Sequence, residues 1–352
     1  METTKDTENE QSPEEVALAA GLRYVVEGDP GITRVTRGRG FSYHTASGRL
    51  IESDQERERL QSLAIPPAWT EVWICPHPDG HIQATGRDSE GRKQYRYHPR
   101  WMEARSRDKF RGMVAFGGVL PRIRRRVRRD LRRPGMPREK VMAVLVRLLD
   151  LTGIRIGNPT SGSSGSFGLT TLRRRHVAFQ NEGVLFRFQG KGDKAHEVRL
   201  SDPGLASVLH ACHEMTGHVL FQFVDEGGGR HPVSADDVND YLRRVSRADI
   251  TSKDFRTWVG SVQALLALEQ LPPPSSEAEG RKNVAHVLDL VSETLRNTPA
   301  VSRDFYVHPL LLSTYLDGTL PERLSEIDAE EIRELRVAER RFLALLKATE
   351  PE

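Results

Sequence analysis

Residues 295–306 read Leu295-Arg-Asn-Thr-Pro-Ala-Val-Ser-Arg-Asp-Phe-Tyr306. We place the functional centre of the chain in this segment. Thr298-Pro299 interrupts one predicted helix, and a new apolar helix is predicted from Pro309. Tyr306 stands between these two helices. A lone tyrosine near a helix end is usually a packing residue, so a reactive role requires cations and a proton donor from elsewhere in the chain.

The chain has 352 residues, of which 37% are hydrophobic, and this is enough for about two domains with ordinary cores. The net charge is only +3, but residues 92–140 contain 18 lysines and arginines against four acidic residues. Such a basic region suits an anionic partner such as nucleic acid. Residues 1–20 are acidic and polar, and we expect them to form a disordered tail.

The chain lacks the sequence features of secreted and membrane proteins. Its two cysteines, Cys75 and Cys212, form no disulfide framework, which suits a reducing compartment. The N-terminus has no signal-peptide pattern, and no apolar run reaches the roughly 18 residues of a membrane span. We therefore expect a cytoplasmic protein that does not interact with membranes.

Residues 21–102 predict a small β-rich domain, because short alternating segments are separated by turn residues. Strands are expected at 32–36, 40–44, 72–75 and 81–85, and helices at 13–21 and 53–63. The domain ends in a segment that mixes cations with aromatic rings, a combination that can contact phosphates and stack on bases or sugars. The candidate nucleic-acid-contacting residues there are Arg92, Lys93, Gln94, Tyr95 and Tyr97. An exposed hairpin without such a role would have the same pattern.

Residues 103–352 predict a mostly helical domain, with the boundary near residue 102. Residues 122–133 contain eight arginines and one acid, and like charges one turn apart repel unless an anion such as phosphate neutralises them. An apolar helix at 138–152 precedes a linker-like Ser/Gly patch at 159–168. Further helices are expected at 203–215, 234–245, 253–271, 278–295 and 327–346.

A three-stranded sheet is expected within this helical domain, from strands at 176–179, 184–189 and 196–200. The first turn lies at 181–183. The second turn, at 190–194, places Lys191 on an exposed, glycine-flanked tip. The fold class is therefore α+β, with a small β-rich domain followed by a mostly α-helical one.

Two patterns resemble ligand sites but lack essential parts. His210 and His213 are three residues apart on a predicted helix, without the second pair of ligands that a zinc site needs. Residues 227–230 are glycine-rich but have neither P-loop spacing nor the Lys-Ser/Thr pair. We therefore expect no metal and no nucleotide cofactor.

Several polar residues in apolar or glycine-rich surroundings form an ordered series along the chain: Arg155, Lys191, Arg256, Asn297 and Tyr306. Either arginine alone could be a structural ion-pair residue. Together with its local contexts, however, the series resembles the type IB DNA topoisomerases, in particular the short poxvirus-like and bacterial enzymes. The matching segments are 154–157, 168–176, 190–196, 253–257 and 297–306, and residues 86–97 look like the DNA-contacting segment of that family.

The resemblance covers about residues 22–325 and implies the catalytic fold shared by tyrosine recombinases and type IB topoisomerases. It implies that Tyr306 attacks a DNA phosphodiester and forms a 3′-phosphotyrosine with a free 5′-hydroxyl. Arg155, Arg256 and Asn297 would bind the non-bridging oxygens, and Lys191 would protonate the leaving oxygen.

At the level of the whole protein, the resemblance implies a monomer that relaxes positive and negative supercoils in double-stranded DNA. It implies that the enzyme needs neither ATP nor a metal, and that it is nucleoid-associated. Arg173 and Lys194, within the matching segments, would be further DNA contacts.

The sequence departs from the family pattern at three places. Asn297 stands where many relatives have histidine, and Asn can donate a hydrogen bond but cannot carry charge. Residues 159–166 lack the tyrosine and charged side chains that viral relatives have after the first catalytic arginine. A charged helix is predicted beyond Tyr306, so the nucleophile is not terminal.

Two other functions fit part of the pattern. A tyrosine recombinase or integrase would share the fold and nucleophile, but that class usually has His-x-x-Arg where this chain reads Lys253-Asp-Phe-Arg256. A non-catalytic DNA-binding protein would use only the basic region, and Tyr306 would then form no covalent adduct with DNA.

Overall fold

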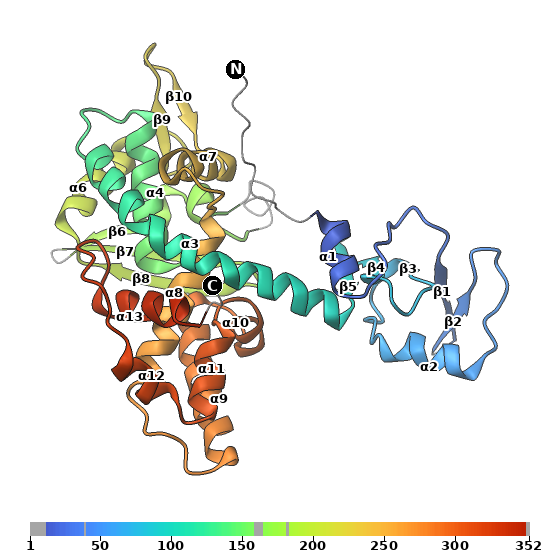
Figure 1. Ribbon diagram of the computed structural model, residues 1–352. Helices are drawn as coiled ribbons and strands as arrows, with labels where there is room; N and C mark the ends of the chain where they lie inside the picture. The colour runs from blue at the N-terminus through green and yellow to red at the C-terminus, as the bar shows by residue number, and fades with distance from the viewer. Residues whose placement is uncertain (1–11, 39, 158–164, 181–182, 350–352) are drawn as a thin grey trace, which may run out of the picture. The chain divides into compact units, whose positions relative to one another are not determined.

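The computed structural model describes residues 12–38, 40–157, 165–180 and 183–349, coloured in Figure 1. Parts of the predicted acidic tail, the Ser/Gly patch and the turn at 181–183 lie outside these ranges. The chain divides into two compact units, residues 1–109 and 110–352. This division falls inside the long helix α3, Pro99–Leu131. The composition change near residue 102 thus lies close to the start of α3. Pro99 is the first residue of this helix, a position where proline is favoured.

The N-terminal unit contains an antiparallel five-stranded sheet in the order β2-β1-β3-β4-β5. Its elements are α1 Pro13–Ala19, β1 Ile32–Arg37, β2 Gly40–His44, α2 Asp54–Ser62, β3 Thr70–Ile74, β4 Ile82–Arg87 and β5 Lys93–Tyr97. Ile32, Ile74 and Ala84 face Leu60 of α2 in its core. The β-rich N-terminal domain is therefore confirmed, and its last hairpin supplies an edge strand, β5.

The predicted acidic tail is ordered in its second half. Ser12 and Glu15 form a reciprocal capping box that starts α1. Val16 and Ala17 are buried and pack in one cluster with Trp101. Residues 13–19 are therefore helical because two apolar side chains within an acidic segment have a buried surface to pack against.

The C-terminal unit is mostly helical and contains a three-stranded antiparallel sheet in the order β6-β7-β8, which confirms the α+β class (Figure 1). Its helices and strands after α3 are α4 Arg138–Thr152, β6 Val177–Gln180, β7 Gly183–Gly190, β8 Lys194–Leu200, α6 Pro203–Glu214, β9 Gln222–Val224, β10 Arg230–Pro232, α7 Ala235–Ser246, α8 Ser252–Leu268, α9 Glu277–Leu295, α10 Pro299–Phe305, α11 Pro309–Leu316, α12 Leu320–Glu326 and α13 Val337–Lys347. Two short 3₁₀ turns, Leu169–Thr171 and Arg174–His176, precede β6.

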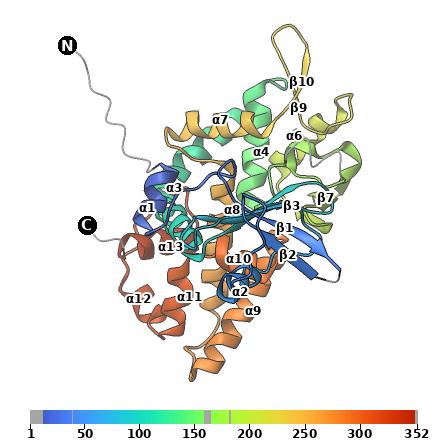
Figure 2. The same cartoon turned by 90° about the vertical axis from the view of Figure 1, so that its right-hand side faces the viewer.

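Helices α4 and α8 form the centre of this unit. Residues 141–146 of α4 are all buried, as expected for a helix that is apolar on every side. Helix α8 contacts α4, α9, α11 and α13, and α9 lies beside α10 and α11 in both views (Figures 1 and 2). Among the described residues, no helix is both long and apolar enough to cross a lipid bilayer.

The helix predicted at 327–346 is wrong in its first half, because helical structure resumes only with α13 at Val337. The carbonyl of Glu334 accepts a hydrogen bond of 2.6 Å from Arg124, and Leu335 is buried. These contacts hold residues 334–336 against α3 in a non-helical conformation. Tertiary contacts therefore outweigh the helical propensity of this charged segment.

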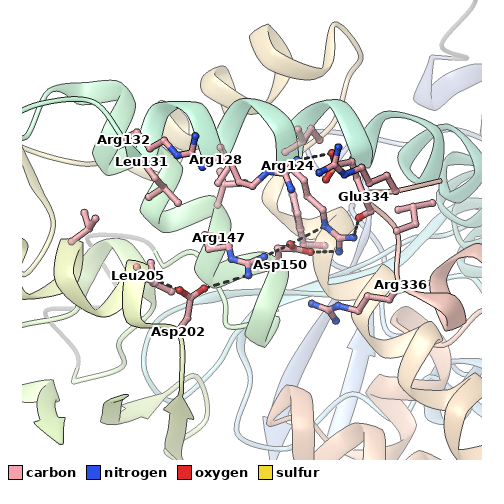
Figure 3. Close-up of a pocket in the computed structure, with 18 residues that line it drawn as sticks. Arg124, Arg128, Leu131, Arg132, Arg147, Asp150, Asp202, Leu205, Glu334 and Arg336 are labelled. Carbon is pink, nitrogen blue, oxygen red and sulfur yellow. Dashed lines mark hydrogen bonds and ion pairs between the residues drawn. The ribbon is translucent and has the colours of Figure 1, made fainter. Parts of the chain in front are cut away.

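The arginine-rich part of α3 is neutralised in part by the protein itself, contrary to the expectation that it needs an external anion (Figure 3). Arg124 reaches Asp150 at 2.6 Å and Glu339 at 2.7 Å, and Arg147 bridges Asp150 and Asp202. Other arginines of this helix also have carboxylate partners, namely Arg126 and Arg133 with Asp130, and Arg128 with Glu334. Most of these acids are distant in sequence, so the pattern of residues 122–133 alone did not reveal them.

Arg124 is the buried centre of this network, and its side chain is only 11% exposed. Burial alone would raise the pKa of the Glu339 carboxyl. The hydrogen bonds and the charge of Arg124 have a larger effect in the opposite direction, so this pKa is lowered. Glu339 also accepts a hydrogen bond of 3.2 Å from the indole of Trp258 on α8. The network therefore connects α3, α4, α8 and α13.

We predict that Arg124→Ala lowers the free energy of unfolding by about 3–5 kcal/mol, because it leaves buried carboxylates without their central cation. The matched control is Arg128→Ala, one turn further along α3, whose 54% exposed side chain should contribute less than about 1 kcal/mol. Urea unfolding of both variants measures the difference. Equal losses would contradict a special role for Arg124.

Candidate active site

Arg155 emerges where α4 ends. Gly153 caps this helix in the left-handed conformation, Ile154 enters the core, and Arg155 is half-buried. The carbonyl of Arg155 accepts a hydrogen bond of 2.9 Å from Leu169, which holds the segment in place. Its guanidinium donates to Oδ1 of Asn297 and, at 3.5 Å, to the carbonyl of Arg296. Arg155 therefore meets residues that follow α9, about 140 positions later in the chain.

Arg256 lies on the second turn of α8 and is only 3% exposed. Its guanidinium donates to the carbonyl of Gly153 and, at 2.9 Å, to the carbonyl of Leu295. These carbonyls belong to the C-terminal ends of α4 and α9, where a cation is favoured by the helix dipole. Burial lowers the pKa of Arg256 to about 10, so the group remains a cation at neutral pH.

Tyr306 follows α10, whose start is set by the Thr298 cap and by Pro299 at its first position. The carbonyl of Tyr306 accepts a hydrogen bond of 3.1 Å from Ser261 on α8. The close approach of the two backbones requires Gly260, because a Cβ there would lie 2.7 Å from the Tyr306 oxygen. The guanidinium carbon of Arg256 is 4.8 Å from the centre of the Tyr306 ring, so the cation and the aromatic ring are in direct contact.

The electrostatic environment prepares Tyr306 to lose its proton. Burial favours the neutral phenol, but the charge and hydrogen bonding of Arg256, with the charges of Arg155 and Lys253, outweigh it and lower the pKa of Tyr306. A phenol whose pKa is lowered is a larger fraction phenolate at neutral pH and is the better nucleophile at that pH. Lys253 thus contributes to the site, although only Arg256 of that motif was assigned a role from sequence.

Two buried donors in this cluster have no hydrogen-bond partner within the described chain: Nδ2 of Asn297 and Nε of Arg256. Buried donors are nearly always paired in native structures, so unpaired ones need an explanation. Oδ1 of Asn297 accepts from Arg155, which orients the amide and leaves its NH2 group, Nδ2, available to donate. Two unpaired donors beside a tyrosine are suited to bind the oxygens of an anion.

The structure brings Arg155, Arg256, Asn297 and Tyr306 together, whereas Lys191 is exposed at the tip of the β7–β8 hairpin. Beneath this tip, the ring of His196 stacks on Phe188 with 4.5 Å between ring centres. A Cβ on Gly190 would collide with the His196 ring, so the glycine permits the hairpin to close over it. The base of the hairpin is thus rigidly packed, and its tip carries the lysine.

The predicted DNA-contacting residues of the N-terminal unit lie on or beside β5. Tyr95 and Tyr97 are exposed and stacked, with 5.7 Å between ring centres. Arg92 pairs with Asp88 at 2.8 Å, Gln94 donates to the same carboxylate at 2.9 Å, and Lys93 pairs with Glu27. The two tyrosines are therefore presented to solvent, while the three polar residues already have partners.

The two candidate DNA contacts of the C-terminal unit lie beside its small sheet. Lys194 is exposed at the start of β8. The Arg173 guanidinium lies over the ring of Phe167, 5.3 Å from its centre. Neither side chain has an ion pair among the residues that the structure describes.

Sequence reasoning missed His196 and Arg296. His196 is buried, and its pKa is lowered to about 4 by burial and by the charges of Arg296, Arg155 and Arg256. His196 is within one of the family-like segments, but alternation along the strand gave no sign that it faced these cations. Arg296 precedes Asn297 directly, and nothing in the local sequence distinguishes it from an exposed helix-end residue.

We predict that His196 makes the protein less stable in acid. An unfolded histidine has a pKa near 6.5, so protons bind preferentially to the unfolded chain between about pH 6.5 and 4. The stabilisation is complete above about pH 6.5 and is lost as pH falls, by roughly 2–3 kcal/mol near pH 4.5. His308, whose pKa is also lowered to about 4 by burial, adds to this effect.

The measurement is urea unfolding at about pH 7 and 4.5. In His196→Gln the difference between the two pH values should shrink by roughly 2–3 kcal/mol, because Gln does not titrate. His210→Gln, at an exposed position on α6, is the control for replacing a histidine by glutamine at the surface. An unchanged difference in His196→Gln would show that His196 is not the titrating group.

Comparison with known families now adds to this geometry. Residues 98–315 match the family described as the catalytic core of eukaryotic DNA topoisomerase I. Residues 40–88 match the N-terminal domain of bacterial DNA topoisomerase IB. The first match covers more than half of the chain and includes every residue of the cluster around Tyr306.

Similar proteins of viral origin match over most of their length. DNA topoisomerase 1B of Acanthamoeba polyphaga mimivirus is 29% identical over 293 residues, which are 81% of this chain and 87% of the viral protein. DNA topoisomerase 1B of Vaccinia virus (strain Copenhagen) is 21% identical over 306 residues, which are 84% of this chain and 93% of that protein. The family match and the arrangement around Tyr306 agree, and the chain belongs to the type IB DNA topoisomerases.

Proposed function

We propose that this topoisomerase relaxes positive and negative supercoils through a transient 3′-phosphotyrosine bond between Tyr306 and one DNA strand. The observation that carries the proposal is the contact of the Arg256 guanidinium with the Tyr306 ring, beside two buried donors without partners. A scissile phosphate placed there would be next to the nucleophile and would accept hydrogen bonds from both donors.

In the cleavage step, Tyr306 reacts as the phenolate after losing its proton: its oxygen forms a bond to phosphorus, and the bond from phosphorus to the 5′ oxygen breaks. Charge accumulates on the non-bridging oxygens in the transition state. Arg155 and Arg256 supply permanently charged, planar donors, and Nδ2 of Asn297 supplies a neutral one. Loss of a single donor of this kind typically slows catalysis by about 10²–10³-fold.

The 5′ oxygen is a poor leaving group as an alkoxide, so it needs a proton as the bond breaks. Lys191 is the proposed proton donor. Its side chain is exposed at the hairpin tip, and we propose that the ammonium reaches this oxygen when DNA is bound. The phosphotyrosine conserves the energy of the phosphodiester. Attack by the 5′-hydroxyl therefore reseals the strand and frees Tyr306 without ATP.

We propose double-stranded DNA as the partner and a monomer as the active form. The stacked Tyr95 and Tyr97 offer aromatic faces, while Arg173 and Lys194 offer cations for phosphates. Between cleavage and resealing, the free 5′ end can rotate, so supercoils of either sign are released. The enzyme would act in the cytoplasm, on the nucleoid, and would require no metal.

The first prediction from this mechanism concerns the nucleophile. The protein should relax a supercoiled plasmid without any special site, at catalytic amounts and in the presence of EDTA, which a site-specific recombinase would not do. Tyr306→Phe should bind DNA normally but form no SDS-resistant adduct and relax no plasmid, because the attacking oxygen is missing. Relaxation by Tyr306→Phe would disprove the mechanism.

Tyr315→Phe is the matched control for this experiment. Its hydroxyl donates to the carbonyl of Pro272 at 3.0 Å and accepts from Asn283 at 2.7 Å. The same substitution there removes structural hydrogen bonds and should cost about 1 kcal/mol of stability. Adduct formation should persist, which separates loss of the nucleophile from a general defect.

The second prediction concerns the proton donor. Lys191→Ala should slow cleavage of ordinary DNA by about 10²–10⁴-fold, the usual contribution of a general acid. A substrate with sulfur at the 5′-bridging position needs no proton, so it should restore the rate of this variant in single-turnover cleavage. Lys194→Ala, four residues from the tip's start, would weaken DNA binding and should not be rescued. Absence of rescue in Lys191→Ala would remove Lys191 from this role.

A further inference from the structure

Arg296 occupies an unusual backbone position next to the active site. It caps α9 in the left-handed conformation, with a φ of 51°, and its N–H donates to the carbonyl of Ser292. Glycine is favoured at such a cap because it has no Cβ to crowd the carbonyl that follows, and asparagine is tolerated because its amide can form a local hydrogen bond. An arginine there calls for a reason beyond helix termination.

The backbone of Arg296 is part of the catalytic cluster. Its carbonyl accepts from Arg155 at 3.5 Å, and the next residue is Asn297. Backbone strain of this kind concentrates at functional sites, where surrounding contacts hold it. The side chain of Arg296 therefore starts from a point that is held close to the scissile phosphate.

The side chain of Arg296 lines an open cavity of about 790 Å³ on the C-terminal unit. Arg173, Arg175 and Arg187 line the same cavity, and Glu197 is the only carboxylate among the described residues of its lining. Glu197 is engaged by Arg187 at 3.1 Å and by Arg199 at 3.3 Å. Within the described chain, Arg173, Arg175 and Arg296 have no ion pair, so this cavity has an excess of positive charge.

His196 lines the wall of this cavity and is also affected by charges of the cluster around Tyr306. Burial is the largest cause of the lowered pKa of His196, and the charge of Arg296 is the next largest. The charges of Arg155 and Arg256 lower the same pKa. His196 also packs against Gly190, directly before Lys191. Arg296 is therefore within electrostatic reach of a group that the two catalytic arginines also affect.

We propose that Arg296 is a positioning residue that binds a backbone phosphate of the cleaved strand next to the scissile phosphate, within the cavity it shares with Arg173 and Arg175. The inference rests on the proposed cleavage of DNA at Tyr306. The guanidinium matches a phosphate because it presents two parallel donors to two oxygens. Binding this second phosphate would set the register of the strand relative to Asn297 and Arg155.

The first test uses variants that keep the fold. Arg296→Gly places the favoured residue at the left-handed cap while it removes the cation, so stability should be retained or rise. Arg247→Gly changes the corresponding cap of α7, where φ is 58°, and gives the stability effect expected for the backbone alone. If the two variants change the free energy of unfolding by similar amounts, the change in Arg296→Gly comes from the backbone. Any change in DNA cleavage by Arg296→Gly then comes from loss of the side chain.

Arg296→Gly should slow single-turnover cleavage by about 10- to 100-fold, as expected for loss of a hydrogen bond to a charged group. The salt dependence of DNA binding should also decrease, with the slope of log K against log salt falling by about 1. Arg296→Lys keeps the charge but loses the paired donors, so it should restore the slope and only part of the rate. Arg281→Gln removes one exposed charge from the same helix and should leave cleavage unchanged.

Substrates with a methylphosphonate at one position at a time identify the phosphate itself. One neutralised phosphate beside the scissile one should slow the wild-type enzyme about 10- to 100-fold and slow Arg296→Gly no further. Additive losses at every position would overturn the proposal, as would normal cleavage by Arg296→Gly. A wild-type protein that forms no covalent adduct would instead overturn the proposed chemistry of Tyr306, and this inference with it.

Discussion

The buried guanidinium of Arg256 is the interaction on which the active site depends. It satisfies the carbonyl groups at the ends of α4 and α9 and lies against the ring of Tyr306. Two helix ends that would otherwise expose unpaired carbonyls are thereby brought together. The segments that follow these ends carry Arg155 and Asn297, so one cation determines where three other functional groups lie.

This arrangement places two buried donors without partners in the described chain beside Tyr306, whereas Lys191 lies apart at the hairpin tip. Burial lowers the pKa of Arg256, whereas its interaction with Tyr306 raises that pKa. The same interaction lowers the pKa of Tyr306. The unpaired donors of Arg256 and Asn297 are costly in a protein interior. That cost would be offset when phosphate oxygens accept both hydrogen bonds, which links DNA binding to stabilisation of the site.

The arginine-rich helix α3 has two kinds of arginine. Arg124 is buried and fixes α13 through Glu339, which in turn contacts Trp258 on the helix that carries Arg256. The C-terminal helix α13, beyond Tyr306, therefore supports α8. Arg128 is more exposed and pairs at the surface. The buried, structural arginines of this run therefore differ from the solvent-facing ones in their carboxylate partners, most of which come from distant parts of the chain.

The sequence by itself determined the α+β class, the three-stranded sheet and the ordered series that ends at Tyr306. These follow from local periodicity, capping residues such as Thr298-Pro299, and motif order, all of which are encoded within short segments. The tertiary structure alone decided that residues 327–336 are not helical, because their contacts with α3 come from far away in the chain. It also decided that His196, Lys253 and Arg296 lie near the cluster around Tyr306, since their proximity arises from packing between elements, which no local pattern records.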